Sequence, residues 1–239
     1  MFASATQTQT QANRPAFVAA QASGIDLWVA DATSAEWLMA RVNVLSPADR
    51  KEFASIQQPA ARWQSMSARI LLRVALCEAV DGEVAASEWT FVKGANGKKA
   101  VAAGQPQVHF SVSHNEKMAV VAVSRTAALG VDVETAGTDV NEDVVADFLS
   151  ASEQASLDSN NASRRCRQFT RFWTLKEAFT KMTGEGLSAD FAKVEFKAHN
   201  DELIASVEAS FETFSIAGCQ IALAIDTAAA GEVTLRDLA

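Results

Sequence analysis

The chain has 239 residues, 49% of them hydrophobic, and a formal net charge of −8 at pH 7. This length suits one large domain or two small ones with a sizeable core. The acidic balance argues against a nucleic-acid-binding protein, and no apolar run is long enough to span a membrane.

Neither the first residues nor the cysteines indicate secretion. Residues 1–17 lack the basic and apolar regions of a signal peptide and are expected to form a disordered arm with no role in the fold. Cys77, Cys166 and Cys219 are far apart and odd in number, and the three histidines show no zinc-ligand spacing. We therefore expect a reduced, cytoplasmic protein.

The first half of the chain is predicted to contain strands and helices. Alternating apolar residues predict a strand over residues 24–30. Ser46 has the position of a helix N-cap, with Pro47 at the first helical position. Helices are expected at residues 35–42, 47–57 and 60–80, and further strands at 89–93, 108–114 and 118–124.

The second half has a similar order of elements. A strand is predicted at residues 129–134, followed by helices and then by closing strands that should be antiparallel. The helices are expected at residues 140–149, 152–159 and 164–182, and the closing strands at 194–196, 205–211, 219–225 and 233–235. The predicted fold is therefore α+β, with two similar α/β halves, residues 18–125 and 126–239, each an antiparallel sheet packed on a long helix.

One helix of the second half carries a row of polar side chains. Trp173, Glu177 and Lys181 are four residues apart and so share one helix face, about one turn from each to the next. A carboxylate and an ammonium group one turn apart can both reach one bound ligand. Lys176 lies roughly a quarter of a turn away and can flank the same site. The alternative is an exposed helix face with a single Glu–Lys pair.

A second acidic motif precedes this helix, in the segment Gly130-Val-Asp-Val-Glu134. The alternation predicts a strand from which Asp132 and Glu134 project on one face, roughly 7 Å apart. Two like charges on an otherwise apolar strand repel each other, and a hard divalent cation such as Mg²⁺ removes that conflict. Glu177 would supply a third carboxylate. The alternative is a solvated strand edge, where acidic residues are common.

The ordered pair of motifs resembles the signature of the 4′-phosphopantetheinyl transferases, of the Sfp type that activates surfactin synthetase. The matching segments are Gly-Val-Asp-Val-Glu at residues 130–134, Trp-Thr-Leu-Lys-Glu-Ala-Phe-Thr-Lys at 173–181 and Gly-Glu-Gly-Leu at 184–187. The resemblance implies two halves related by a pseudo-twofold axis, with the coenzyme in the cleft between them. It also implies Mg²⁺-dependent transfer of 4′-phosphopantetheine from coenzyme A to a serine of an apo carrier protein, with release of 3′,5′-ADP.

The resemblance assigns roles to the residues of the two main motifs. Asp132, Glu134 and Glu177 would hold Mg²⁺. Glu177 would also take the serine proton, directly or through a metal-bound water. Lys176 and Lys181 would bind the coenzyme through fixed positive charge, and Lys181 would protonate the departing phosphate.

Two shorter segments match the family in the first half of the chain. Phe110-Ser-Val-Ser-His114 is similar to a family segment whose Ser and His contact coenzyme A phosphates, which implies that role for Ser113 and His114. Gly97-Lys98-Lys99 is similar to Gly-Lys-Pro, which implies that Lys98 lies near the nucleotide.

Two positions depart from the family pattern. Lys99 stands where the pattern has proline, which should loosen the turn. Gln64 stands where an arginine near the 3′-phosphate of the coenzyme is expected. Arg62 or Arg50 would have to make that contact instead, and we assign it to Arg62.

Two other classes of protein stay open at this point. One is a Mg²⁺-dependent phosphodiesterase or nuclease, although the helical spacing of Glu177 and Lys181 and the acidic net charge disfavour it. The other is a non-enzymatic module that binds coenzyme A or a carrier protein. Release of 3′,5′-ADP would separate the transferase from both. The sequence does not identify the carrier, and a monomer is the default expectation.

Overall fold

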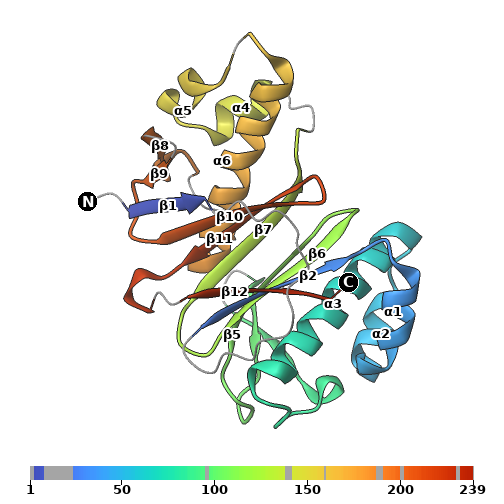
Figure 1. Ribbon diagram of the computed structural model, residues 1–239. Coiled ribbons are helices and arrows are strands. Elements are labelled where there is room, and N and C mark those ends of the chain that lie inside the picture. The colour runs from blue at the N-terminus through green and yellow to red at the C-terminus, as the bar shows by residue number, and fades with distance from the viewer. Residues whose placement is uncertain are drawn as a thin grey trace.

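The computed structural model describes residues 3–7, 24–94, 97–137, 142–158, 160–186, 191–199, 202–229 and 232–238. Two β-sheets lie at the centre of the molecule, with helices on both sides (Figure 1). The six-stranded sheet has the order β7 (Leu129–Thr135), β11 (Cys219–Ile225), β10 (Ser210–Ile216), β1 (Ala3–Gln7), β9 (Glu202–Ala205) and β8 (Phe196–His199). The four-stranded sheet has the order β12 (Val233–Asp237), β2 (Ile25–Asp31), β6 (Met118–Ser124) and β5 (His109–His114).

The helices begin and end near the expected residues. They are α1 (Ala35–Arg41), α2 (Pro47–Ala54), α3 (Pro59–Ala79), α4 (Glu142–Phe148), α5 (Ala151–Ser156) and α6 (Ala162–Thr183). The cap predicted for α2 is confirmed, because the Ser46 side chain accepts a hydrogen bond from the Asp49 backbone and the Asp49 side chain accepts one from the Ser46 backbone. Helix α6 ends at Gly184, whose φ of 79° lies in the left-handed region that favours glycine.

Side chains alternate between two cores along the central strands. On β2, Trp28 and Ala30 face α3, whereas Leu27 and Val29 join a core that also contains residues of β7 and β11. A third core lies between α6 and the outer face of the six-stranded sheet. The layers are therefore α3, the four-stranded sheet, the six-stranded sheet and α6, with each sheet packed on a long helix as expected (Figure 1).

Both ends of the chain pair differently from the expectation. The sheets are not wholly antiparallel, because β12 pairs parallel with β2, a strand of the first half. Residues 3–7 of the expected arm form β1, which pairs parallel with β10 and antiparallel with β9. The other residues of the arm lie outside the described part of the chain. Period-two patterns indicate a strand but not its partner, and an open sheet edge accepts any extended backbone.

The predicted strand over residues 205–211 is also wrong in its extent. Strand β9 ends at Ala205, the chain turns, and β10 begins at Ser210. The turn is closed by a backbone hydrogen bond from Ala209 N–H to the Val207 carbonyl. A short antiparallel hairpin is formed by β3 (Phe91–Lys93) and β4 (Lys99–Val101), and Phe91 packs against Arg69 and Arg73 of α3. Among the described residues, no helix has the length and apolar character needed to cross a membrane.

Candidate active site

The two sheets meet along β5 and β7, which are end strands of their sheets. Two serine side chains of β5 join them. Val131 N–H donates a hydrogen bond of 3.0 Å to Ser111 Oγ, and Ser113 Oγ donates one of 2.8 Å to Asp132 Oδ1. Both contacts are buried, so the hydroxyl groups replace the ladder of backbone hydrogen bonds that a continuous sheet would have. The acidic motif on β7 therefore lies at the junction of the two sheets.

Helix α6 adds a cation to this junction. Lys181 Nζ lies 2.6 Å from Asp132 Oδ1 and 3.0 Å from Ser113 Oγ. Asp132 is 3% exposed, and its Oδ2 atom is buried without a hydrogen-bond partner among the described residues. Asp132 Oδ1 thus accepts hydrogen bonds from Ser113 and Lys181, whereas Oδ2 is available to a further partner.

Glu134 and Glu177 complete the acidic cluster. Trp173 Nε1 donates a hydrogen bond of 3.2 Å to Glu134 Oε1, so the helix residue predicted to share the face of Glu177 orients this carboxylate. Burial raises the pKa of Glu134, and the charge of Asp132 raises it further. Burial also raises the pKa of Glu177, and the charge of Asp132 raises it further. Asp132 is therefore close enough to both glutamates to disfavour their charged forms.

The cluster fits a hard divalent cation in its chemistry. Within the described ranges, no three His, Cys, Asp or Glu side chains are gathered as a metal site. Lys181 binds one oxygen of Asp132, and Trp173 holds Glu134. Carboxylate ligands without their cation are expected to show two features, an oxygen without a partner and raised pKa values. Asp132 Oδ2 has the first feature, and Glu134 and Glu177 have the second.

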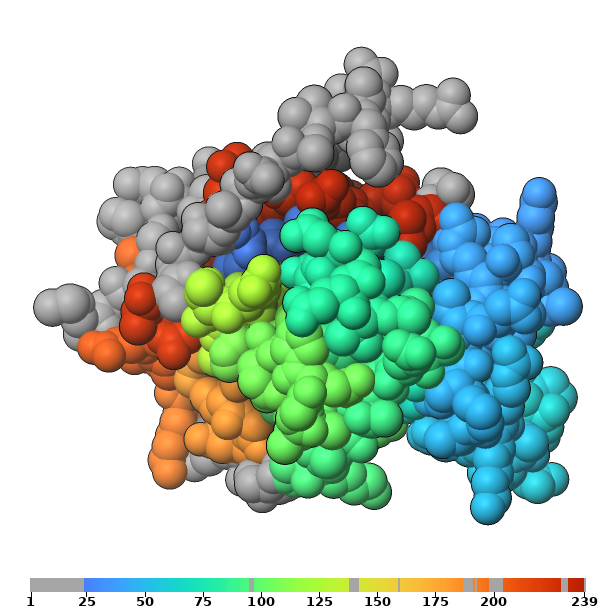
Figure 2. Space-filling view, turned by 90° about the horizontal axis from the view of Figure 1, so that it is seen from below, coloured from blue at the N-terminus to red at the C-terminus, as the bar shows by residue number. Residues whose placement is uncertain are grey.

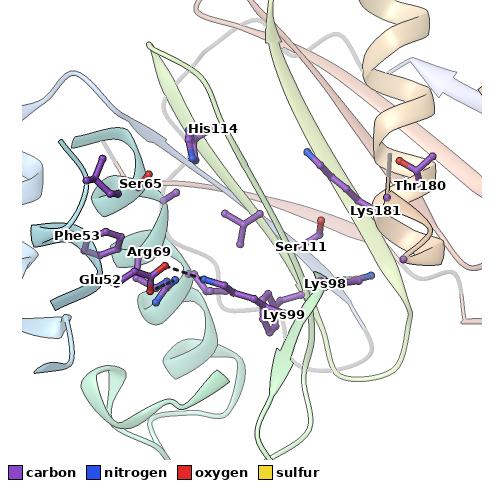
Figure 3. A pocket seen from close by; sticks show the side chains of 18 residues that line it. Glu52, Phe53, Ser65, Arg69, Lys98, Lys99, Ser111, His114, Thr180 and Lys181 are labelled. Carbon is purple, nitrogen blue, oxygen red and sulfur yellow. Dashed lines mark hydrogen bonds and ion pairs between the residues drawn. The ribbon is translucent and has the colours of Figure 1, made fainter. Parts of the chain in front are cut away.

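A pocket of about 450 Å³ opens beside this cluster. One wall comes from α2, α3 and β5, and the other from the C-terminal end of α6 (Figure 3). Seen from below, green residues of the β3–β5 region lie between the blue helices of the first half and orange residues of the second half (Figure 2). The polar lining residues include Lys98, His114 and Lys181. Lys181 therefore belongs both to the acidic cluster and to the pocket.

Lys98 reaches from the hairpin to the other wall of the pocket. Its Nζ lies 3.1 Å from the Met182 carbonyl and 3.4 Å from the Leu129 carbonyl. Burial lowers the pKa of Lys98. The ammonium group caps the last turn of α6, where carbonyl groups are otherwise unpaired. An anion at this end of the pocket would meet a cation already held in place.

His114 lies at the end of β5 and lines the pocket. Burial lowers the pKa of His114, and the charge of Lys181 lowers it further. The imidazole is therefore neutral at pH 7, and it can donate a hydrogen bond to an anion through one ring nitrogen.

Comparison with known proteins finds a family match in the second half of the chain. Residues 128–220 match the family model of the 4′-phosphopantetheinyl transferase superfamily. This segment belongs to that superfamily. The resemblance inferred from the two motifs is therefore confirmed.

Individual relatives carry the same name. A 4′-phosphopantetheinyl transferase of Bacillus pumilus is 33% identical over 145 residues, which are 58% of this chain and 61% of the relative. The transferase Sfp of Bacillus subtilis is 26% identical over 96 residues, 40% of this chain and 42% of the relative. The L-aminoadipate-semialdehyde dehydrogenase-phosphopantetheinyl transferase of Xenopus laevis is 24% identical over 176 residues, 69% of this chain and 57% of the relative. The chain thus spans at most 61% of the length of these three proteins.

One residue of the superfamily motif, Lys176, does not reach the pocket. Its side chain is fully buried, and Nζ lies 2.7 Å from Glu153 Oε2, 2.9 Å from the Phe148 carbonyl and 2.8 Å from the Phe191 carbonyl. The quarter turn between Lys176 and Glu177 directs the lysine toward α4 and α5 rather than toward the pocket. Lys176 therefore anchors these segments to α6, which does not fit the coenzyme contact expected from the sequence.

The arginines expected to compensate for Gln64 are also occupied elsewhere. Arg62 donates to the Ile56 carbonyl through Nε at 3.0 Å and Nη2 at 2.7 Å. Arg50 donates to the Val42 carbonyl at 3.0 Å and the Leu45 carbonyl at 3.3 Å. Neither arginine, nor Gln64, lines the pocket described above. Both arginines close turns between helices of the first half, so the assignment of Arg62 to the coenzyme does not fit the structure.

Several polar residues that line the pocket were missed by the sequence reasoning, among them Ser111 and Arg69. Ser111, rather than Ser113, lines the pocket, because Ser113 is committed to Asp132 and Lys181. Arg69 lines the pocket from α3 and pairs with Asp49. The alternation of β5 could have drawn attention to Ser111, which shares a strand face with Ser113. No local signal joins Arg69 to an acid twenty positions earlier in the chain.

Proposed function

We propose that this chain transfers the 4′-phosphopantetheine group of coenzyme A to a serine of an apo carrier protein and releases 3′,5′-ADP. One observation carries the proposal: Lys181 pairs with Asp132 in the acidic cluster and also lines the cationic pocket. A phosphate of a bound ligand would therefore lie between cations of the pocket and the carboxylates of β7 and α6. The names of the relatives support the same reaction.

Asp132, Glu134 and Glu177 are the residues that would hold Mg²⁺. When bound, the ion would neutralise charge on the pyrophosphate of the coenzyme. Its binding would also offset the repulsion that raises the pKa values of Glu134 and Glu177.

The other groups of the site bind the coenzyme and move protons. Lys98, His114 and Lys181 would bind phosphate oxygens from the pocket walls. Glu177 would accept the proton of the carrier serine, directly or through a water. The serine Oγ–P bond forms, and the P–O bond to 3′,5′-ADP breaks. Lys181 would give a proton to the departing phosphate.

The proposal extends to the arrangement of the whole chain. We propose that residues 18–125 and 126–239 are halves related by a pseudo-twofold axis, with the site between them. The packing of α3 on one sheet and α6 on the other supports this relation. We further propose a cytoplasmic monomer, which suits the three free cysteines, Cys77, Cys166 and Cys219.

Intact mass spectrometry of an apo carrier protein tests the reaction. The full chain is incubated with the carrier, coenzyme A and Mg²⁺, and we expect the carrier to gain one phosphopantetheine, with the gain lost in EDTA. Glu177→Gln should lower the rate by at least about 100-fold while the protein stays folded. Glu83→Gln, which removes an exposed carboxylate outside the pocket lining, is the matched control.

Other outcomes would overturn the proposal. No gain on several carriers, together with tight coenzyme A binding, would identify a binding module. Cleavage of a phosphodiester without modification of a carrier would indicate the phosphodiesterase class. Full activity of Glu177→Gln would contradict only the assignment of Glu177 as the base, not the proposed reaction.

A further inference from the structure

Three aromatic rings meet beside the acidic cluster. The ring centre of Trp173 lies 4.3 Å from that of Phe148 and 6.5 Å from that of Phe191, and the Trp173 and Phe191 rings are inclined by only 5°. The rings of Phe148 and Phe191 lie 4.6 Å apart. The indole of Trp173 also donates its hydrogen bond to Glu134 from Nε1. The packing of the indole ring therefore sets the direction in which this N–H points.

Phe148 and Phe191 come from outside α6, the helix that carries Trp173. Phe148 is the last residue of α4, and Phe191 is the first residue of a short 3₁₀-helix, Phe191–Lys193. Lys176 of α6 holds the backbone of both residues, because its Nζ lies 2.9 Å from the Phe148 carbonyl and 2.8 Å from the Phe191 carbonyl. The lysine therefore fixes, relative to α6, the two residues whose rings pack on Trp173.

This anchor is buried and rigid. The side chains of Lys176 and Glu153 are 0% exposed, and Lys176 Nζ also donates a hydrogen bond of 2.7 Å to Glu153 Oε2. Glu153 in turn accepts hydrogen bonds of 2.8 Å from Ser150 N–H and 2.9 Å from Phe196 N–H. A buried polar network of this kind resists rearrangement, since each broken bond would leave a charge or a polar group without a partner. The two phenylalanines thus have fixed places beside the indole.

The indole N–H is suited to hold a carboxylate that binds an ion. It is only a donor and carries no charge, so it can fix one oxygen of Glu134 without repelling a cation. Groups that orient a metal ligand in this way typically change the metal affinity by about 10- to 100-fold when they are removed. The orientation of Trp173 should therefore be measurable in the affinity of the site for Mg²⁺.

We propose that Phe148 and Phe191 are positioning residues of the metal site, which hold the Trp173 indole so that its N–H fixes the Glu134 carboxylate. Lys176 sets the places of both phenylalanines. The inference rests on the proposed function, in which Glu134 is a ligand of Mg²⁺. It deepens that function, because it gives residues outside the acidic cluster a part in metal affinity without any contact with the ion or the coenzyme.

Isothermal titration calorimetry of the full chain with Mg²⁺ alone tests this role. Trp173→Phe keeps an aromatic ring but removes the donor, and it should bind Mg²⁺ about ten-fold more weakly than the wild type. Phe191→Leu removes the flat ring, and it should bind Mg²⁺ about two- to five-fold more weakly, because it acts one contact further from the ion. Phe196→Leu is the matched control. It makes the same change in the same core, where Phe196 packs on Phe211, and it should keep the Mg²⁺ affinity of the wild type.

The double variant Trp173→Phe/Phe191→Leu separates positioning from a general loss of stability. It should bind Mg²⁺ no more weakly than Trp173→Phe, because Phe191 acts only through the indole N–H. Two independent effects would instead add.

Exchange of the Trp173 indole proton with solvent, followed by NMR without metal, supplies a second measurement. The exchange should be faster in Phe191→Leu than in the wild type, whereas Phe196→Leu should leave it unchanged.

Three results would overturn the inference and leave the proposed function standing. Phe191→Leu binds Mg²⁺ like the wild type, Phe196→Leu loses as much affinity as Phe191→Leu, or the effects of Trp173→Phe and Phe191→Leu add. If the wild type binds no Mg²⁺, the metal-dependent reaction itself fails, and proton exchange alone decides. Faster exchange in Phe191→Leu only would support the hold on Trp173, and unchanged exchange would overturn it as well.

Discussion

A Cβ atom on Gly130 would lie 2.0 Å from the carbonyl oxygen of Ala178, so β7 and α6 cross with their backbones in direct contact. The same added atom would lie 2.4 Å from the Met182 backbone nitrogen. This close crossing brings the acidic motif of β7 next to the Glu–Lys row of α6. The glycine that opens the Gly-Val-Asp-Val-Glu motif is thus required for close packing.

Gly130→Ala should therefore destabilise the protein and separate the two motifs. Neither contact can be relieved by a flexible side chain, so we expect a loss of about 3 kcal/mol or more in the free energy of unfolding. Urea denaturation followed by circular dichroism measures it. Gly24→Ala is the control, because its added Cβ would lie 3.4 Å from the Glu232 carbonyl oxygen, an ordinary packing distance. Equal stability of the two variants would contradict the close crossing.

Lys176→Met should destabilise the protein without acting through coenzyme binding. The substitution leaves Glu153, whose side chain is 0% exposed, without its cation and deprives the Phe148 and Phe191 carbonyls of a donor. Removing one partner of a buried pair costs about 3–5 kcal/mol. Urea denaturation measures this loss, and the exposed Lys197→Met should change stability by less than about 0.5 kcal/mol.

The double variant Lys176→Met/Glu153→Gln separates the two roles of Lys176. It should recover part of the lost stability, because the unpaired charge is also removed. An unchanged unfolding free energy for Lys176→Met, together with a raised KM for coenzyme A, would instead restore the coenzyme contact expected from the sequence.

The sequence predicted which side chains of α6 and β7 lie together better than it predicted the pairing of the chain ends. Helical and strand periods correctly placed Glu177 and Lys181 on one helix face and Asp132 on the facing strand, because each period defines a face. The helical period did not predict the buried position of Lys176, because a residue a quarter turn from that face can point either toward the ligand or into the core. They also could not foresee the parallel pairing of β12 with β2, because an alternating pattern does not identify its neighbour.

Addition of Mg²⁺ should raise the melting temperature of the protein after EDTA treatment. An ion that binds only the native state at 100 times its Kd stabilises it by about 2.7 kcal/mol, or about 5–10 °C for a chain of this size. Differential scanning fluorimetry at constant ionic strength measures the shift. Asp132→Asn should abolish it, whereas Asp147→Asn, an exposed position on α4, should keep it. A shift of the same size in Asp132→Asn would show that this aspartate does not bind the ion.

The stability of the metal-free protein should depend on pH through Glu134 and Glu177. Burial raises the pKa of both carboxyl groups above the ordinary 4.5, so the native state binds more protons than the unfolded state between the two values. Each charged glutamate therefore costs stability at pH 7, and this cost disappears as the pH falls through the raised pKa. Glu134→Gln should be more stable than the wild type at pH 7 in EDTA, by about 0.2–1 kcal/mol, the size of one like-charge contact.

That gain should shrink as the pH falls toward 4.5, which urea denaturation at pH 7 and pH 5 measures. Glu195 supplies a control of opposite sign. A hydrogen bond from Ser152 lowers the pKa of Glu195, so its charged form stabilises the native state above the ordinary value and this contribution is lost as the pH falls. Glu195→Gln should therefore be less stable than the wild type at pH 7. A Glu134→Gln variant that loses stability at pH 7, as Glu195→Gln does, would mean that the acidic cluster carries no charge repulsion for a cation to relieve.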